Sequence, residues 1–184
     1  MSGWSLVLHG GSGVIDRADL RSEQDRAYRA ALSAAAEAGA AVLRAQGSAL
    51  DAVEAAVRAL EDEPLFNAGR GAVFTDEGKV ELDAAIMDGA TLNAGAVAGV
   101  SATRNPVSLA RAVMEHSPHV FLIGEGADHF SEARGLEKVE PGYFFVEGRW
   151  RALEKQLQRE GLPVPPRPSG IADDHPVAAL AHDE

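Results

Sequence analysis

The chain carries several hydroxyl side chains, but none has the surroundings of a catalytic nucleophile. The candidates are Ser12, Thr75, Thr91 and Thr103. None of them sits in the strand–turn–helix motif that exposes a nucleophilic serine, and none has histidine and carboxylate neighbours in a recognisable pattern. Cysteine is absent, which excludes thiol nucleophiles, disulfides and thiolate metal sites. A catalytic triad therefore cannot be argued from these residues.

The acidic residues and the histidines likewise form no recognisable metal site or acid–base pair. His116 and His119 are three residues apart, but Pro118 lies between them and no carboxylate is spaced to complete a metal site. Asp83 and Asp88 are five residues apart on one expected strand, so their side chains point to opposite faces and cannot act as a directly paired acid and base. We expect Asp83 to hold a neighbouring loop and Asp88 to open a turn.

A glycine-rich loop follows the first apolar run. Residues 4–8 read as a short strand, and His9-Gly10-Gly11-Ser12-Gly13 comes directly after it. Backbone N–H groups of such a loop can hold an anion, but the Lys-Ser/Thr pair of a P-loop is missing and the spacing is not that of a dinucleotide fingerprint. A tight turn and an anion-binding loop both remain open from this pattern alone.

The most distinctive stretch is residues 60–106. Within it, residues 64–71 (Pro-Leu-Phe-Asn-Ala-Gly-Arg-Gly) form a loop, because proline fixes one end and two glycines allow backbone conformations closed to other residues. The pattern predicts strands at residues 72–75 and 79–87, joined by a hairpin turn at Asp76-Glu77-Gly78. The next strand, residues 91–100, has only small side chains along most of its length. Small residues on both faces predict that other layers pack closely on this sheet.

The remaining elements surround this stretch. Helices are expected at residues 22–45, 48–61, 106–115, 127–134 and 149–159, and strands at 119–123 and 143–146, with a turn at Gly124-Glu125-Gly126. Ser48 with Asp51 resembles a capping box, and Pro106 fits the first position of a helix. The first helix carries an alanine stripe that favours close docking on a sheet. The second has an apolar face made of Leu50, Val53, Val57 and Leu60. Both are expected to form one outer layer. Together these elements indicate an α+β layered sandwich.

Composition narrows the class of protein. With 184 residues, 46% of them hydrophobic, the chain is long enough for one domain with a real core. A formal charge of -11 argues against binding to nucleic acid or to an anionic membrane. No run approaches the length of a membrane span, and the N-terminus shows no signal-peptide pattern, so we expect a cytoplasmic protein. Residues 161–184 are rich in proline and are expected to form a mobile linker after a domain over residues 1–160.

Two runs carry a resemblance to a known family. They are LFNAGRGAVFT at residues 65–75 and ELDAAIMDGATLNAGAVAGVSATRNPVSLARAVMEHSPHVFLIGEGA at residues 81–127. Together they resemble the α subunit of the plant-type L-asparaginase/isoaspartyl peptidase family, the self-cleaving threonine hydrolases of the N-terminal nucleophile superfamily. The resemblance extends from His9 to about Glu137. It implies a four-layer αββα sandwich that a β subunit completes.

The resemblance also implies where the nucleophile comes from. In the family it resembles, a precursor cuts itself at a Gly-Thr bond, and the new N-terminal threonine attacks the substrate. A free α-amine can serve as base for the hydroxyl of the same residue, so no histidine is needed. This sequence ends in Asp183-Glu184 with no Gly-Thr in reach. We therefore expect it to be the α half, with the threonine, the oxyanion donors and the substrate-gripping Arg and Asp on a partner chain.

By the same resemblance, the α half supplies a few supporting groups. Asn67 is expected beside the nucleophile, where its amide holds a water or the developing oxyanion; the alternative is a turn asparagine that stabilises its own loop. His9, Gly10 and Gly11 match the loop next to the nucleophile. A structural sodium ion is expected on six backbone carbonyls, those of Leu60, Glu61, Glu63, Phe66, Ala68 and Arg70, and no organic cofactor is expected.

The implied activity is hydrolysis of L-asparagine and β-aspartyl (isoaspartyl) dipeptides, by an α and a β subunit that pair as (αβ)2. A glycosylasparaginase is the nearest alternative, because it shares the MDG-T-GAV block; the run GAVAGVSATRNP and the absence of a secretion signal favour the first activity. A non-catalytic binding module on the same scaffold and a glycine-loop phosphate binder are the alternatives from other classes.

Overall fold

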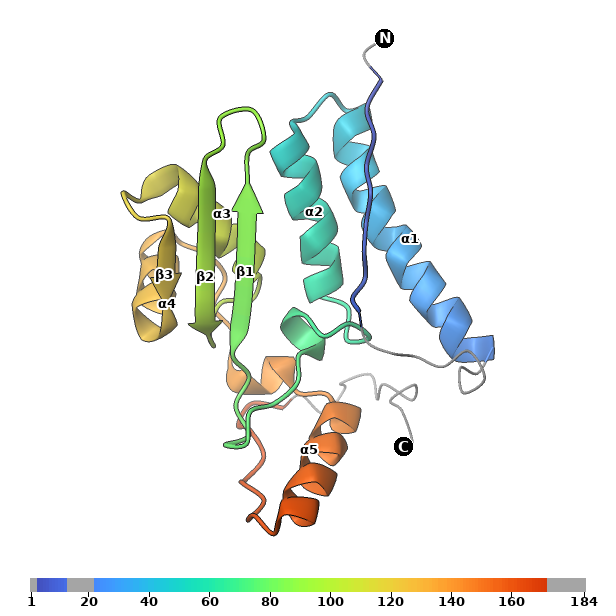
Figure 1. The fold of residues 1–184 in the computed structure, drawn as a ribbon, viewed down its shortest axis with the longest axis vertical. Coiled ribbons are helices and arrows are strands. Elements are labelled where there is room, and N and C mark those ends of the chain that lie inside the picture. Colours follow the sequence, from blue (N-terminus) through green and yellow to red (C-terminus); the bar gives the residue numbers. More distant parts are fainter. Residues whose placement is uncertain (1–2, 13–21, 172–184) are drawn as a thin grey trace.

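The computed structural model describes residues 3–12 and 22–171 and has an α+β fold (Figure 1). Its helices are α1 (Ser22–Arg44), α2 (Ala49–Glu61), α3 (Pro106–His116), α4 (Gly124–Ala133) and α5 (Glu147–Glu160), with 3-10 turns η1 (Gly69–Gly71) and η2 (Pro141–Phe144). The strands are β1 (Leu82–Met87), β2 (Ala94–Val100) and β3 (Phe121–Ile123). The α+β class expected from the sequence is confirmed.

The first two helices form a closely packed pair. Gly39 of α1 lies so near α2 that an added Cβ would stand 2.8 Å from the carbonyl oxygen of Ala52, so only glycine permits this approach. The Ser48 hydroxyl accepts the Asp51 N–H at 3.0 Å, and Asp51 accepts the Ser48 N–H at 3.3 Å, which is the predicted capping box. Both helices begin and end within about two residues of their predicted bounds.

The three strands form one sheet in the order β1-β2-β3. β1 and β2 are antiparallel, with Ala85 opposite Ala96, and β2 and β3 are parallel. The β1–β2 register shifts near Asp83, and the Asp83 carboxylate accepts the N–H of Gly99 at 2.9 Å. We expected Asp83 to hold a neighbouring loop; it holds the adjacent strand instead, because the register shift leaves that N–H without a ladder partner.

One face of the sheet is covered by helices and contains the core. Gly95 of β2 lies directly under α3, where an added Cβ would stand 2.1 Å from the Ala110 carbonyl oxygen. Leu109 and Val113 of α3 and Val97 of β2 are completely or almost completely buried there. The small residues of β2 therefore allow the close approach of a second layer that the sequence predicted, on this face.

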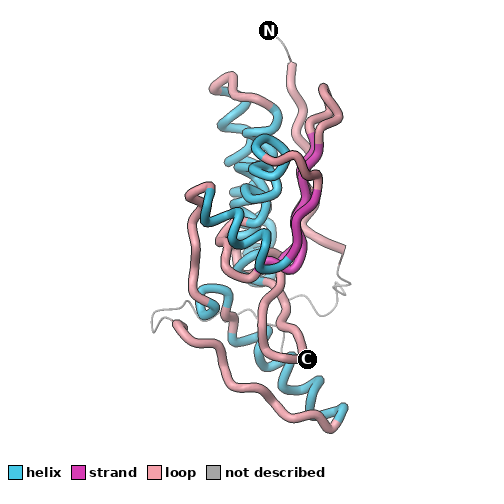
Figure 2. Tube along the Cα trace, turned by 90° about the vertical axis from the view of Figure 1, so that its left-hand side faces the viewer, coloured by secondary structure: helices cyan, strands magenta, loops and turns pink. Residues whose placement is uncertain are grey.

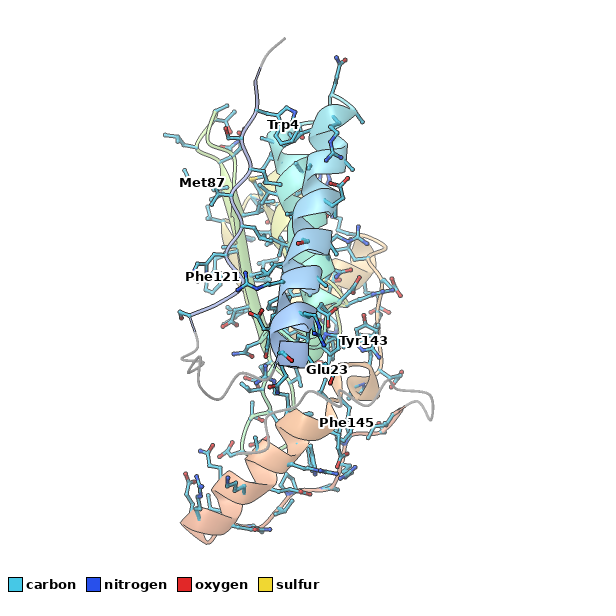
Figure 3. All side chains as sticks on the ribbon, turned by 90° about the vertical axis from the view of Figure 1, so that its right-hand side faces the viewer. Trp4, Glu23, Met87, Phe121, Tyr143 and Phe145 are labelled. Atoms are coloured by element: carbon cyan, nitrogen blue, oxygen red, sulfur yellow. The ribbon has the colours of Figure 1, made fainter. Side chains whose placement is uncertain are left out.

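The opposite face of the sheet has no covering layer among the described residues. Figure 2 shows the helices that pack on the sheet on one side of the strands, with α5 beyond the lower end of the sheet (Figure 1). Met87, Phe121 and Ile123 are 56%, 54% and 64% exposed, and Figure 3 shows Met87 and Phe121 projecting away from the helices. A sheet whose free face carries large apolar side chains is the expected state of a layer that packs against another layer.

The predicted strand at residues 4–8 is not a strand in the structure. Residues 3–12 run extended beside α1 and α2 (Figure 1), but no described strand lies alongside to complete a ladder. Leu6 turns toward Gly39 of α1, whereas Val7 is 92% exposed. The alternation of apolar residues is thus that of a strand, and the prediction failed because a strand needs a neighbour for its backbone hydrogen bonds.

Several other predictions require correction. Residues 72–75 and 79–81 are not strands, although the Thr75 N–H bonds the Lys79 carbonyl at 2.8 Å across the predicted turn. Gly124 starts α4, so the expected turn at 124–126 is helical. The expected strand at 143–146 is replaced by η2 and an extended bend, because Phe144 and Phe145 bury themselves against the helix that follows. That helix, α5, begins at Glu147, two residues earlier than predicted.

Residues 161–171 lie along α5 and the loops beside it. Gly161 ends α5 in the left-handed conformation, with φ at 71°. Arg167 pairs with both carboxylate oxygens of Glu147, at 2.8 and 3.1 Å, and stacks over the ring of Phe145. Pro165 rests on Gly78. The rest of the proline-rich stretch predicted as a linker, residues 172–184, lies outside the described residues.

Candidate active site and family

The loop after α2 is wound tightly around two glycines. Gly69 has a φ of +49°, and an added Cβ there would stand 2.3 Å from the carbonyl oxygen of Glu61. A Cβ on Gly71 would stand 2.0 Å from the Phe66 oxygen and 2.5 Å from the Pro64 oxygen. Both positions therefore require glycine, and three carbonyl groups of the loop turn toward its interior.

Asn67 lies at the tip of this loop. Its side-chain oxygen accepts the N–H of Val73 at 3.0 Å, so it braces the loop, as the structural alternative predicted. Its amide nitrogen has no hydrogen-bond partner among the described residues, and the residue is exposed on the wall of a cavity of about 250 Å³. The same side chain can therefore hold the loop with its oxygen and offer a neutral N–H donor with its nitrogen.

The glycine loop after residue 8 meets the Asn67 loop. An added Cβ on Gly10 would stand 3.0 Å from the ring of Phe66, the residue before Asn67. The ring nitrogen Nδ1 of His9 accepts the N–H of Gly11 at 3.1 Å, which places the proton of a neutral His9 on Nε2. The structure thus brings together His9, Gly10 and Gly11 with the Asn67 loop, although more than fifty residues separate them in sequence.

The same loop offers backbone oxygens to a hard cation. The carbonyl oxygens of Glu61 and Phe66, two of the six predicted to hold sodium, face Gly69 and Gly71. An added Cβ on either glycine would clash with them. Neither oxygen accepts a backbone hydrogen bond within the loop, whereas the carbonyls of Leu60, Glu63 and Ala68 each accept one. Inward-facing, underused carbonyl oxygens suit Na⁺, which takes oxygen ligands rather than nitrogen or sulfur. Two of the six carbonyls are therefore free to take the expected ion, and the sodium site stays a prediction.

Glu61 is a buried acid that sequence reasoning did not identify as one. Its side chain is only 3% exposed, and one carboxylate oxygen accepts the Val107 N–H at the start of α3, at 2.9 Å. The other oxygen has no partner among the described residues. Burial raises the pKa of Glu61 to about 7, and the bond from Val107 and the nearby amide of Asn105 offset this only in part. That amide is itself hydrogen bonded to Asp62.

Asp62 joins three segments below the Asn67 loop. One of its oxygens accepts hydrogen bonds from Arg104 at 3.1 Å, from Asn105 at 3.3 Å and from the hydroxyl of Tyr143 at 3.0 Å. Arg104 and Arg70 each stack on the ring of Tyr143, at 5.4 and 5.5 Å. Burial raises the pKa of Tyr143, and the negative charge of Asp62 adds to the effect. Asp62, Arg104, Asn105 and Tyr143 form a hydrogen-bonded hub. Neither this hub nor Glu61 follows a spacing that a sequence pattern would reveal.

The other hydroxyl candidates have structural roles where the structure describes their bonds. Thr75 accepts the Lys79 N–H and Thr91 donates to Asp88, which opens its turn as predicted. Thr103 donates to Asp128 of α4. These threonines close turns and tie β2 to α4, so within the described part of the chain they are not placed for nucleophilic attack.

A larger hollow, of about 380 Å³, lies over α4 and the end of β2, away from Asn67. Its inner carboxylate, Asp128, is already bonded to the N–H groups of Ser101 and Ala102 and to the hydroxyl of Thr103. We therefore place the site at the smaller cavity. Over residues 3–12 and 22–171, no group of three or more His, Asp or Glu side chains is arranged to hold a metal ion. None of the helices there is long and apolar enough to cross a bilayer.

Comparison with known proteins agrees with this arrangement. Residues 2–168 match the family model described as asparaginase. The chain is 56% identical over 159 residues to an isoaspartyl peptidase of Escherichia coli, covering 86% of this chain and 49% of the relative. It is 48% identical over 157 residues to a plant-type L-asparaginase of Thermococcus kodakarensis, covering 85% and 50%. The chain thus spans about half the length of the curated relatives it matches, and it belongs to the asparaginase family that includes the isoaspartyl peptidases and plant-type L-asparaginases.

Proposed function

We propose that this chain is the α half of an amidohydrolase that cleaves L-asparagine and β-aspartyl dipeptides. The observation that carries the proposal is the match of nearly the whole chain to only half of each relative, among them enzymes named for these two activities. The nucleophile is a threonine at the N-terminus of a second half made from the same precursor. The cut that separates the halves falls after the described residues.

Three features of the fold support a second half. Within residues 3–12 and 22–171, β1 is an edge strand, the N-terminal segment is extended without a ladder, and the helix-free face of the sheet exposes Met87 and Phe121. Strands from a second chain would pair with the first two and a second sheet would cover the third, which makes the four-layer αββα sandwich. We expect two such αβ units to associate, and the enzyme to work in the cytoplasm.

The proposed reaction needs little from this half beyond position and hydrogen bonding. The threonine hydroxyl attacks the side-chain amide carbon while its proton passes to the α-amine of the same residue. The tetrahedral oxyanion collapses, the carbon–nitrogen bond breaks, and the leaving ammonia or amino acid takes that proton. Water then hydrolyses the acyl-enzyme. Asn67 contributes a neutral N–H donor near the nucleophile, while His9, Gly10 and Gly11 form the adjoining wall.

A sodium ion would be held by the carbonyl oxygens of Leu60, Glu61, Glu63, Phe66, Ala68 and Arg70. When bound, it neutralises the converging carbonyl dipoles and so stiffens the loop that carries Asn67. The loop's own contacts, from Asn67 to Val73 and from Arg149 to the Gly71 carbonyl at 2.9 Å, act in the same direction. A thermal midpoint that rises with NaCl but not with choline chloride at equal ionic strength would support the site; equal midpoints would count against it.

The full gene product tests the proposed function. Its intact mass should show two fragments, the second beginning with threonine, and the purified protein should release ammonia from L-asparagine and aspartate from β-aspartyl dipeptides. Replacing that threonine by alanine should leave one uncut chain with no activity. α-Aspartyl dipeptides serve as the control substrate, since cleavage of both kinds would indicate an ordinary peptidase. A single uncut chain that hydrolyses neither substrate would overturn the proposal.

A further inference from the structure

The turn between β1 and β2 holds a leucine in a backbone conformation that glycine or asparagine usually takes. Leu92 has a φ of +61°, and its N–H bonds the carbonyl oxygen of Asp88 at 2.8 Å. In this left-handed region the Cβ of an ordinary residue crowds a backbone carbonyl oxygen, so a leucine is strained there. Of the described residues other than glycine, only Gln46 shares the conformation.

Packing within the described residues does little to offset this strain, because Leu92 is 70% exposed. The turn is nevertheless held in place. The Asp88 carboxylate accepts the Ala90 N–H at 3.0 Å and the Thr91 hydroxyl at 2.7 Å, and the Thr91 oxygen accepts the Asn93 N–H at 3.3 Å. A single exposed leucine is ordinary. A strained leucine that a fixed turn points into solvent indicates a contact outside the described residues.

The turn continues the open face of the sheet. It follows Met87, the last residue of β1, which is 56% exposed and projects away from the helices (Figure 3). It stands at the end of the sheet opposite α5 (Figure 1). The cavity beside Asn67 is at the other end of β1, where Leu82 and Asp83 line it. A layer that covers the open face along β1 therefore meets Leu92 after Met87, away from the candidate site.

We propose that Leu92 is an apolar anchor for the second half of the protein, whose covering layer buries it together with Met87. The inference rests on the proposed second half but not on its chemistry. Two observations favour this occupant: the matched relatives are about twice as long as the aligned part of this chain, and the exposed apolar side chains of the open face lead up to the turn. Because the turn is fixed in advance, the leucine enters the contact without further ordering of the backbone.

Leu92→Asn gives a sharp test, because asparagine is close to leucine in shape and tolerates the left-handed conformation, but is polar. Gln46→Asn is the matched control, since Gln46 has a φ of +63° and is exposed after the end of α1. Thermal unfolding of the full gene product is measured for both. We expect Gln46→Asn to leave the midpoint unchanged or to raise it by about 1 °C. Leu92→Asn should lower it by roughly 3–6 °C, since a buried leucine is lost.

The two variants separate an anchor from a solvent-exposed turn residue. If Leu92 stays in water in the complete protein, relief of strain dominates, Leu92→Asn behaves like Gln46→Asn, and the inference fails. Leu92→Met keeps an apolar side chain and should change the midpoint by less than about 2 °C; a loss as large as that of Leu92→Asn would also count against the anchor. Light scattering tests a second copy as the occupant. If Leu92→Asn halves the molar mass of the assembly, Leu92 lies between copies and the proposal is overturned.

Ammonia release from L-asparagine, measured well below the thermal midpoint, reports on the proposed function separately. Because Leu92 and the Asn67 cavity lie at opposite ends of β1, Leu92→Asn should keep the activity of the unsubstituted protein. A full gene product that lacks activity yet shows the midpoint loss would overturn the hydrolase proposal and keep the anchor. An active protein without the loss would do the reverse.

Discussion

The two faces of the sheet differ in how completely this chain covers them. On the helix-covered face, Gly95, Val97 and Val113 leave no space between β2 and α3, and the packing is complete within this chain. On the other face, Met87 and Phe121 are more than half exposed. Substitutions on the covered face therefore test the stability of this chain by itself. Substitutions on the open face test the contact that we expect with a second half. Asn67 and Glu61 lie by the β1 edge, where the completed and the open parts of the molecule meet.

The largest expected effect is on the covered face. Gly95→Ala would place a methyl group 2.1 Å from the Ala110 carbonyl oxygen, and backbone on both sides leaves little room to relax. We expect a loss of about 3 kcal/mol in the free energy of unfolding. Ala96→Val, at the next position of β2 and on the free face, is the matched variant and should cost less than about 1 kcal/mol in the chain alone. Urea unfolding measures both, and equal losses would erase the distinction between the faces.

The second effect concerns pH. The folded pKa of Glu61, about 7, lies above its ordinary value of 4.5, so the folded chain holds a proton that the unfolded chain releases. Stability of the chain alone therefore falls as pH rises from 4.5 to 7, by about 3 kcal/mol from this residue, and the loss is complete above pH 7. Glu61→Gln should remove that part of the slope. Urea midpoints between pH 4.5 and 8 test it, and parallel curves for both proteins would show that Glu61 does not titrate as inferred.

The features behind these two experiments differ in how far the sequence could predict them. The helix start at Pro106, the capping box of Ser48 and Asp51 and the small residues of β2 are local signals, and each was predicted correctly because short-range geometry decides it. The juxtaposition of His9 with the Asn67 loop came only from the family resemblance. The burial of Glu61 could not be predicted, because a glutamate at a helix end is ordinarily exposed and only the tertiary placement of α3 covers it.

The wrong strand predictions have two physical sources. Residues 4–8 and 72–75 have the composition of strands, but a strand is made by its neighbours, and none of the described strands lies beside them. The strand predicted at residues 143–146 is absent for another reason. Phe145 packs against Phe74 and Trp150, which also contact each other, and not against a sheet. Local propensity therefore sufficed where this chain is complete and failed most where a second layer is expected.

A third prediction concerns Asn67, which lines the cavity beside β1. Asn67→Ala in the two-chain protein removes a neutral donor and one bond to Val73. We expect kcat for L-asparagine to fall roughly 100-fold with little change in KM, because an oxyanion donor acts in the transition state. The thermal midpoint should fall by only about 2–4 °C, the worth of one hydrogen bond. Unchanged turnover would remove Asn67 from the site and leave it as a loop brace.

The smallest expected effect lies in the hub below the loop. Tyr143→Phe keeps the ring that Arg70 and Arg104 stack on and removes only the hydroxyl bonded to Asp62. Asp62 retains its bonds from Arg104 and Asn105, so we expect a loss of about 1 kcal/mol in the free energy of unfolding. Tyr143→Ala, which also removes the ring, should cost about 2 kcal/mol more, since both stacks go with it. Because the hub lies wholly within this chain, both losses should be the same in the chain alone and in the two-chain protein. A larger loss in the two-chain protein would mean that the hub also contacts the second half.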